Sequence, residues 1–452
     1  MADSLKNLLR IREGEGRTVV LLGVILMLNT LALEAGDVVA VAGFLGSVDV
    51  SNILILWIID MIMILAVGSI QGLIVDRYSR MKLLRAFSLL FAVIFGALTL
   101  LFAAGVSDTI TYGLLFLLVE QQNIFLPLIF WIFASELFTA AQSRRLFPVI
   151  ASWSAIGQII GLTLASAAPV IRDALGISNV ALLPFNMLLY LISAVLLHYG
   201  FRKVQIQTVH TAEKSAHWRD NVTRGWDYIR RIEALRYMTI ASFCAIIVLT
   251  IIDYHFLAVA THAFAAETTS ISFQTFYGIY RLVMTILIIL TQNLVANRLI
   301  ERYGIKNALV AVPIIVLGGA LFVFIGPGLF FVAVARAVIR LVNSSIDLPA
   351  QKAFLALMPE DVRGAVSIFT DGYNFAIGAI ISSVVIGAVV FGIPSLAGTI
   401  SPTTIYLAVG LLFAIVGIIA VRAMYRSYDA TLFNWRLKRR QRTASVLKDL
   451  EF

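Results

Sequence analysis

Long apolar stretches separated by short polar ones fill almost the whole chain. A helix that crosses about 30 Å of hydrocarbon needs about 20 apolar residues, and twelve stretches reach that length. They lie at residues 18–44, 52–75, 83–105, 111–134, 146–171, 179–200, 237–261, 270–296, 308–326, 328–350, 364–391 and 402–421. The longest polar interruption, residues 201–236, separates the sixth stretch from the seventh. The pattern therefore predicts an all-α membrane protein with 12 transmembrane helices in two groups of six.

The polar segments complete a five-part organisation. Residues 1–17 are expected to be an amphipathic segment, in which "SLKNLLRIR" forms a short helix lying on the membrane surface. An N-terminal six-helix bundle at 18–200 and a C-terminal one at 237–424 flank a cytoplasmic linker at 201–236. Residues 425–452 form a basic cytoplasmic tail.

Basic side chains are concentrated in one alternate set of loops. If the N-terminus is cytoplasmic, the inner segments hold the Arg77–Arg85 cluster, Arg144, Arg145 and the basic tail, whereas the outer loops hold only Arg172. Cytoplasmic loops of membrane proteins carry an excess of Lys and Arg. The distribution therefore predicts that both the N- and C-termini are cytoplasmic.

Composition agrees with this picture and excludes several classes of function. Of 452 residues, 60% are hydrophobic and only 13% are charged, and the mean hydropathy is +0.93. Soluble domains are far less apolar. The loops account for the net charge of +9 without a nucleic-acid partner. One cysteine, five scattered histidines and the lack of a Ser/His/Asp constellation or phosphate-binding loop argue against an enzyme, a metal site or a cofactor.

Two short phrases recur at matching places in the two halves. "IVDRYSRMK" (74–82) and "IERYGIK" (300–306) each follow the second span of their half. "AIGQII" (155–160) in the fifth span is echoed by "AIGAII" (376–381) in the eleventh. The halves are therefore predicted to be parallel six-helix repeats.

The first phrase carries a known pattern. "GLIVDRYSRMK" resembles the loop signature of the major facilitator superfamily, Gly-x-x-x-Asp-Arg-x-Gly/Ser-Arg-x-Lys. The matching positions are Gly72, Asp76, Arg77, Arg80 and Lys82. The resemblance implies the major facilitator fold, in which the glycine permits close helix contact and the aspartate meets basic partners between the halves. We expect Gly72, Asp76, Arg77 and Arg80, with Asp371 of span eleven, to control gating. The alternative is a loop that is merely basic.

Ionisable side chains within the spans are unevenly distributed. Spans three, six, nine and twelve have none in their apolar cores. Spans one, two, four, seven, eight, ten and eleven carry Glu34, Asp37, Asp60, Glu120, Asp253, Arg281, Arg336, Arg340 and Asp371, and span five has no charge. Because charged groups inside a membrane usually face a cavity, the pattern predicts a polar central pathway and four helices that face lipid.

Helical spacing narrows the candidate binding residues. Arg336 and Arg340 share one face of span ten, Tyr277 and Arg281 share one of span eight, and Asn374 lies on the face of Asp371 in span eleven. We expect the substrate to be bound by Arg281, Arg336, Arg340, Tyr277 and Asn374. A guanidinium group can hold a carboxylate or phosphate through two parallel hydrogen bonds, so the substrate is expected to be anionic.

A second interpretation of the same charges stays open. The arginines could instead pair with Glu34, Glu120 or Asp253 and neutralise one another. Both can hold in turn, because a substrate anion can displace an internal carboxylate. Removal from water favours the neutral form of a carboxyl group, so Glu34, Asp37, Glu120 and Asp253 are candidate proton carriers; the alternative for each is a structural partner.

Three patches show a closer resemblance. Residues 130–161 resemble the fourth-to-fifth span region of bacterial and plastid ATP/ADP translocases, residues 343–374 resemble the corresponding C-half stretch, and the opening "LLRIREGEGR" is similar to bacterial relatives. The matches are Phe130-Trp131, Phe133-Ala134, Arg144-Arg145, Phe147-Pro148, Gly157, Gly161, Pro349, Pro359, Arg363-Gly364 and Asp371-Gly372. The resemblance implies a nucleotide transporter allied to the major facilitator superfamily.

These observations predict a secondary active transporter of an anionic or zwitterionic solute, with nucleotide-like molecules foremost. It would work by alternating access, driven by proton coupling or by exchange (antiport), as a monomer in the lipid bilayer of a bacterial inner (plasma) membrane. One alternative is a proton-coupled carrier of amino acids, peptides or drugs on the same fold. Another is a transporter-derived sensor or anchor, whose tail and linker, with Trp218 and Trp226, recruit a partner.

Overall fold

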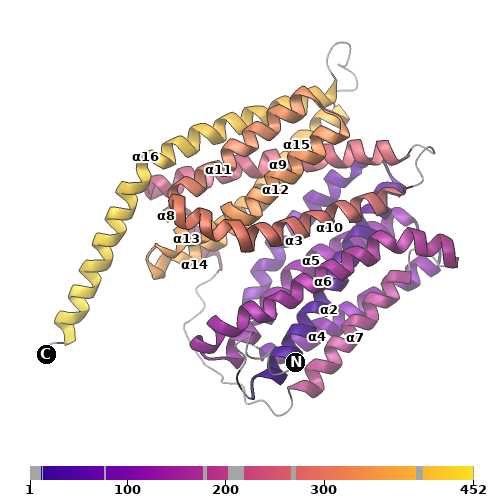
Figure 1. The fold of residues 1–452 in the computed structure, drawn as a ribbon, viewed down its shortest axis with the longest axis horizontal. Coiled ribbons are helices and arrows are strands. Elements are labelled where there is room, and N and C mark those ends of the chain that lie inside the picture. Colours follow the sequence, from indigo (N-terminus) through magenta and orange to yellow (C-terminus); the bar gives the residue numbers. More distant parts are fainter. Residues whose placement is uncertain are drawn as a thin grey trace. The chain divides into compact units, whose positions relative to one another are not determined.

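The computed structural model describes residues 12, 14–75, 78–176, 181–201, 218–265, 271–392 and 401–450. Side chains are described within these ranges except at 67–75, 140, 175, 218–221, 265, 296–297, 300, 360–361 and 436–450. Every regular element in the described ranges is a helix (Figure 1). Helices suit a chain of this hydropathy, because in lipid each backbone N–H and C=O must be satisfied within its own segment.

The chain divides into two compact units. Unit 1 comprises Met1–Leu56, Ala66–Glu213 and Phe264–Ile286, and unit 2 comprises Trp57–Leu65, Lys214–Ala263 and Leu287–Phe452. In the described ranges before the linker, the helices are α2 (Gly16–Ser47), α3 (Ile53–Val75), α4 (Arg80–Ala103), α5 (Asp108–Leu137), α6 (Ala140–Leu175) and α7 (Leu182–Gly200). A short 3₁₀ turn at Val50–Asn52 lies between α2 and α3. The first part of α10 (Phe273–Thr291) also belongs to unit 1.

The remaining helices lie in the second half of the chain. They are α8 (Trp218–Arg231), α9 (Glu233–Ala265), α11 (Asn297–Ile325), α12 (Leu329–Val342), α13 (Leu348–Ala356), α14 (Glu360–Ile368), α15 (Asn374–Gly392) and α16 (Pro402–Leu450). Figure 1 shows α16 as one continuous helix, so the predicted tail at 425–450 extends the last span rather than forming a separate element.

The helices are long and apolar enough for a multi-pass membrane protein. Eleven spans in the described ranges meet this criterion, and an additional apolar helix, described at Val50–Ala66, corresponds to the second predicted span. The all-helical membrane architecture predicted from hydropathy is therefore confirmed. The count of twelve and the orientation of the termini stay predictions.

Close packing of α2 against α6 organises unit 1. A Cβ atom added at Gly157 would lie 2.4 Å from the carbonyl oxygen of Met27, and one at Gly161 would lie 2.6 Å from that of Leu31. Only glycine allows the two backbones to approach this far. The two glycines of α6 therefore act as a helix-packing pair. They determine where α2, which bears Glu34 and Asp37, lies along α6.

Unit 2 is built around an aromatic contact between α13 and α16. Phe354 is fully buried and its ring lies 5.3 Å from those of both Tyr428 and Trp435. Lys306 of α11 donates to Asp429 at 2.6 Å and lies 3.9 Å from the centre of the Tyr425 ring. The part of α16 beyond the predicted membrane span is thus packed against its own unit.

Three one-turn π-helices interrupt predicted continuous spans in unit 2. They are η3 (Gln292–Ala296), η4 (Asn343–Asp347) and η5 (Phe369–Tyr373). The side-chain amide of Gln292 donates to the carbonyl oxygen of Ser344 at 3.1 Å, which joins η3 to η4. A π turn adds one residue to a helix. The α-helical face shared by Arg336 and Arg340 is therefore not continued regularly beyond Val342.

The repeated charged phrase adopts a helix break in both copies. In the first, Ser79 is non-helical (φ −59°, ψ 127°) and directly precedes α4. In the second, Gly304 has φ 76° and ψ 160° inside α11. The two residues occupy equivalent places in "DRYSRMK" and "ERYGIK", so the sequence repeat coincides with a structural one.

Candidate functional site

Two carboxylates and one guanidinium form a buried ion cluster in unit 1. Nη2 of Arg281 donates to Oε2 of Glu34 at 2.7 Å, and Nη1 of the same arginine pairs with Asp37. The three side chains are only 12–24% exposed. Two acids against one base give this acidic cluster (Glu34, Asp37 and Arg281) a formal charge of −1.

Local packing positions the acidic cluster. Glu34 and Asp37 lie one turn apart on α2, and a Cβ at Gly161 would come 3.2 Å from Cβ of Glu34. On α10, the buried ring of Tyr277 lies 5.8 Å from Cζ of Arg281. One helical turn before Arg281, Gly278 leaves no room for a Cβ against Ser166 of α6.

A complementary cluster lies in unit 2. Nε of Arg336 donates to Oδ1 of Asp253 at 2.6 Å, and Nη2 of Arg340 donates to Oδ2 at 2.8 Å. The Arg336 side chain is 5% exposed, whereas that of Arg340 is 47% exposed. One acid shared by two bases gives this basic cluster (Asp253, Arg336 and Arg340) a formal charge of +1.

Aromatic and polar contacts hold the basic cluster in place. Cζ of Arg336 lies 4.4 Å above the buried ring of Phe256, one turn from Asp253 on α9. Between them on the chain, His255 donates from Nε2 to the carbonyl oxygen of Pro327 at 2.9 Å and accepts from the hydroxyl of Tyr406 at 2.8 Å. Both ring nitrogens of His255 are thus used in fixing α9, which agrees with a structural role for this residue.

The remaining predicted binding and coupling residues are placed as follows. Asn374 is buried at the first position of α15, and its Nδ2 has no hydrogen-bond partner in the described part of the chain. Glu120 is half-buried on α5. Asp371 lies in η5, accepts from Oγ of Ser367 at 2.6 Å and pairs with Lys352.

The predicted gating loop is described only in part. Asp76 and Arg77 lie outside the described residues, as do the side-chain surroundings of Gly72. Arg80, in the first turn of α4, pairs with Glu136 near the end of α5, with 3.2 Å between Nε and Oε1. The charge of this arginine is therefore directed to a neighbouring helix of its own unit.

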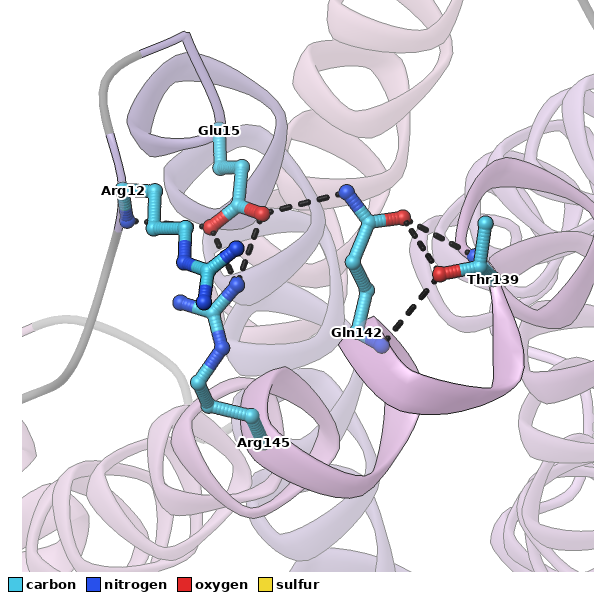
Figure 2. Close-up of polar contacts among 5 residues, drawn as sticks. All are labelled: Arg12, Glu15, Thr139, Gln142 and Arg145. Carbon is cyan, nitrogen blue, oxygen red and sulfur yellow. Dashed lines mark hydrogen bonds and ion pairs between the residues drawn. The ribbon is translucent and has the colours of Figure 1, made fainter.

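The sequence did not indicate a further polar cluster that joins the starts of α2 and α6 (Figure 2). Glu15 accepts hydrogen bonds from Arg145 at 2.7 Å and 2.9 Å, from the side chain of Gln142 at 3.1 Å and from the backbone N–H of Arg12 at 3.0 Å. Gln142 also completes a capping box with Thr139. The Thr-x-x-Gln spacing was the available sequence signal for this helix start.

The environment of Glu15 shifts its acidity. Burial raises the pKa of its carboxyl group, but the hydrogen bonds from Arg145, Arg12 and Gln142 and the charge of Arg145 outweigh burial and hold the pKa below its usual value. The ion pair between Glu15 and Arg145 also brings together two of the patches that carry the translocase resemblance, "REGEGR" and Arg144-Arg145.

Comparison with known proteins identifies the fold and the family. The nucleoside transporter NupG superposes with a TM-score of 0.64 at 17% identity, covering 91% of this chain and 99% of that chain. The POT family transporter PepTSo gives 0.64 at 12% identity (90% and 98%), and a bacterial homologue of the human lysosomal transporter Spinster, inward-facing and unoccupied, gives 0.57 at 14% (94% and 99%). These likenesses show a shared fold, that of major facilitator-type transporters.

No curated protein sequence matches the chain. The model of the TLC ATP/ADP transporter family matches residues 99–343, which is more than half of its length. This match confirms the resemblance seen in the sequence. The protein is a multi-pass membrane transporter that belongs to the TLC ATP/ADP transporter family.

Proposed function

We propose that the protein is a secondary active transporter that moves an anionic or zwitterionic solute by alternating access, with nucleotide-like molecules as the first class to test. The observation that carries this proposal is the sharing of one carboxylate, Asp253, by two guanidinium groups. An incoming phosphate or carboxylate finds paired donors already oriented by the protein.

A substrate anion that replaces Asp253 as the partner of Arg340 could shift the conformational equilibrium of the protein. Arg340 is half exposed and can turn to an incoming anion, while buried Arg336 keeps Asp253 as its partner. A ligand shifts a conformational equilibrium only by contacts that differ between the two states. Release of Arg340 from Asp253 is such a difference. Asn374, with an unused amide donor, would add a hydrogen bond to the same solute.

The acidic cluster supplies the coupling element of the proposal. Glu34 and Asp37 share Arg281, and protonation of either acid would balance the cluster's charge. A proton can therefore be taken up when Arg281 moves away from one of the acids and released when the arginine pairs with both acids again. Glu120 is a further candidate carrier, and Tyr277 would line the pathway beside Arg281.

The family fold suggests the remaining parts of the mechanism. We assign twelve spans with cytoplasmic termini, a monomer and a bacterial inner membrane. Gly72, Asp76, Arg77 and Arg80 would form the gate of the first half. Asp371, paired with Lys352 beside a π turn, would do so in the second.

Uptake into proteoliposomes tests the proposal. Purified protein is reconstituted and supplied with labelled ATP, ADP, AMP, a nucleoside or a dipeptide, with and without a proton gradient. We expect nucleotide uptake that Arg340→Gln and Arg336→Gln each reduce about tenfold, the loss typical of a charge-assisted hydrogen bond. The matched control, Arg422→Gln on the exposed face of α16, should transport normally.

Other outcomes would replace the proposal. Proton-driven dipeptide uptake without nucleotide uptake would favour a peptide carrier on this fold. Nucleotide uptake that ignores both arginine variants would remove the basic cluster from the substrate site. Melting temperatures of all variants, measured in parallel, separate loss of binding from loss of folding.

A further inference from the structure

The linker helix α8 is docked against unit 2 at a close backbone contact. A Cβ at Gly225 would lie 2.4 Å from the carbonyl oxygen of Ala365 in α14. Beside it, the ring of Trp226 lies 5.1 Å from that of Phe369, and Ile229 is 1% exposed in the core of the unit. The linker between the two six-helix groups therefore contains a helix, α8, that packs at a defined position on unit 2.

Docking leaves a hollow of about 440 Å³ between α8 and α14. It is lined by Thr223, Arg224, Asp227, Tyr228, Arg231 and Val362. All but Val362 come from α8, and four of them follow the spacing i, i+3, i+4 and i+7 that places side chains on one face of a helix. The volume is within the range of pockets that hold small organic ligands.

The charges of the hollow indicate the chemistry of its ligand. Arg224 and Arg231 carry two positive charges against the single negative charge of Asp227, and within the described part of the chain neither arginine has an ion pair. The backbone positions of the two arginines lie roughly 10 Å apart along α8. A guanidinium group binds phosphate oxygens, whereas a carboxylate between them accepts hydrogen bonds from hydroxyl groups.

We propose that the hollow between α8 and α14 binds a phosphorylated polyol, with Arg224 and Arg231 on the phosphate and Asp227 on the hydroxyl groups. The site is separate from the transport site and does not depend on the proposed substrate. Two sources present this chemistry: the headgroup of phosphatidylglycerol and a free nucleoside monophosphate. A ligand bound in the hollow would stabilise the packing of α8 against α14, the helix that continues into η5 and Asp371.

The test uses full-length protein in two arms. One arm titrates AMP into protein in phosphatidylcholine nanodiscs and follows the melting temperature. The other uses native mass spectrometry to count phosphatidylglycerol molecules retained from mixed phosphatidylglycerol and phosphatidylcholine micelles. A response to AMP that persists when the basic cluster is impaired identifies a nucleotide site in the hollow, and selective retention of phosphatidylglycerol identifies a lipid site.

Two variants and a matched control decide whether the hollow is responsible. The double variant Arg224→Gln/Arg231→Gln should weaken binding at least about tenfold, because each guanidinium contributes charge-assisted hydrogen bonds. Arg230→Gln removes the same charge from an exposed position of α8 outside the hollow and should bind normally. The AMP titrations are repeated in an Arg336→Gln background, which weakens the proposed transport site, so that the response of the hollow is measured apart from substrate binding.

Gly225→Ala supplies an independent criterion. It keeps both arginines but prevents the close approach to Ala365, so we expect it to lose binding as well. The proposal is overturned if neither AMP nor phosphatidylglycerol responds, or if the double variant still binds. It is also overturned if Arg230→Gln loses as much as the double variant, or if Gly225→Ala binds normally, because charge alone would then account for binding.

Discussion

In the basic cluster, Arg336 and Asp253 are largely shielded from water, with side chains 5% and 19% exposed, and this shielding determines what the loss of either charge costs. Asp253→Asn would leave the buried Arg336 without its carboxylate. Breaking a buried ion pair on one side costs about 3 kcal/mol or more. We expect a clearly lower melting temperature for this variant.

Asp173→Asn provides the matched control for that substitution. Asp173 also pairs with an arginine, Arg172, but the two side chains are 69% and 44% exposed. Exposed ion pairs contribute less than about 1 kcal/mol. Equal destabilisation by the two variants would contradict the burial argument.

Glu15 gives a prediction about pH. Its native carboxyl has a pKa below 4.5, so as the pH falls the unfolded chain takes up the proton before the native one does. The stabilisation from Glu15 is therefore complete well above pH 4.5 and is lost as the pH falls through the native pKa. The difference in melting temperature between the wild type and Glu15→Gln should be constant near neutral pH and shrink in acid. A difference that grows in acid would refute this assignment.

The residue scale also shows what sequence reasoning could reach. Buried arginines and acids were expected either to bind substrate or to pair with one another, and the structure shows pairing of Arg281, Arg336 and Arg340. Which acid meets which arginine was not predictable, because it depends on how helices distant in the chain pack. The Glu15–Arg145 contact was missed for the same reason.

At the scale of helices, the close packing of α2 against α6 leaves no room for a side chain at Gly157. Gly157→Ala would place a Cβ 2.4 Å from the backbone of α2, which cannot yield as a flexible side chain could. Overpacking of this kind costs about 1–3 kcal/mol. Thermal unfolding should therefore begin at a lower temperature in this variant.

Gly318→Ala on α11 serves as the comparison. A Cβ at Gly318 meets nothing within 4 Å, and alanine favours a helix more than glycine does, so its stability should be equal or slightly higher. If both alanine variants behaved alike, the close approach of α2 and α6 would not be a constraint on the fold.

Helices as elements were well predicted, whereas their irregularities were not. Apolar length alone placed each predicted span on a helix, because lipid leaves the backbone few alternatives. The π turns at η3, η4 and η5 add one residue each without changing composition. Arguments from regular α-helical periodicity therefore do not extend across Val342 and Asn343.

On the scale of the whole molecule, the C-terminal helix contributes to the core of unit 2 as well as to a predicted membrane span. A chain that stops after Met424 would lose Tyr428 and Trp435 and uncover Phe354. Loss of large aromatic contacts costs about 3–5 kcal/mol. We expect this truncation to melt at a much lower temperature and to accumulate poorly in membranes.

A chain that stops after Trp435 is the control and should retain wild-type stability, since both rings remain. Normal stability after the longer truncation would show that the packing of α16 on Phe354 is dispensable. Because the two truncations differ by eleven residues of one helix, the comparison separates this packing from any function of the last residues.

The all-helical membrane architecture followed from hydropathy, and the family match confirms the resemblance that the sequence patches carry. The roles of the individual site residues could not be predicted from the sequence, because a buried charge has the same sequence signature whether it binds a solute or a neighbouring side chain. Net charges of −1 and +1 for the two clusters become visible only when the helices are assembled.

The three π turns have a consequence for how this chain can tolerate change in length. Deletion of one residue from an ordinary helix rotates everything beyond it by about 100° and buries the wrong face. Deletion within η3, η4 or η5 would instead convert the wide turn to a regular one and leave the flanking helices in register. Within the described helices, we therefore expect these turns to accept the loss of one residue more readily than the regular turns around them.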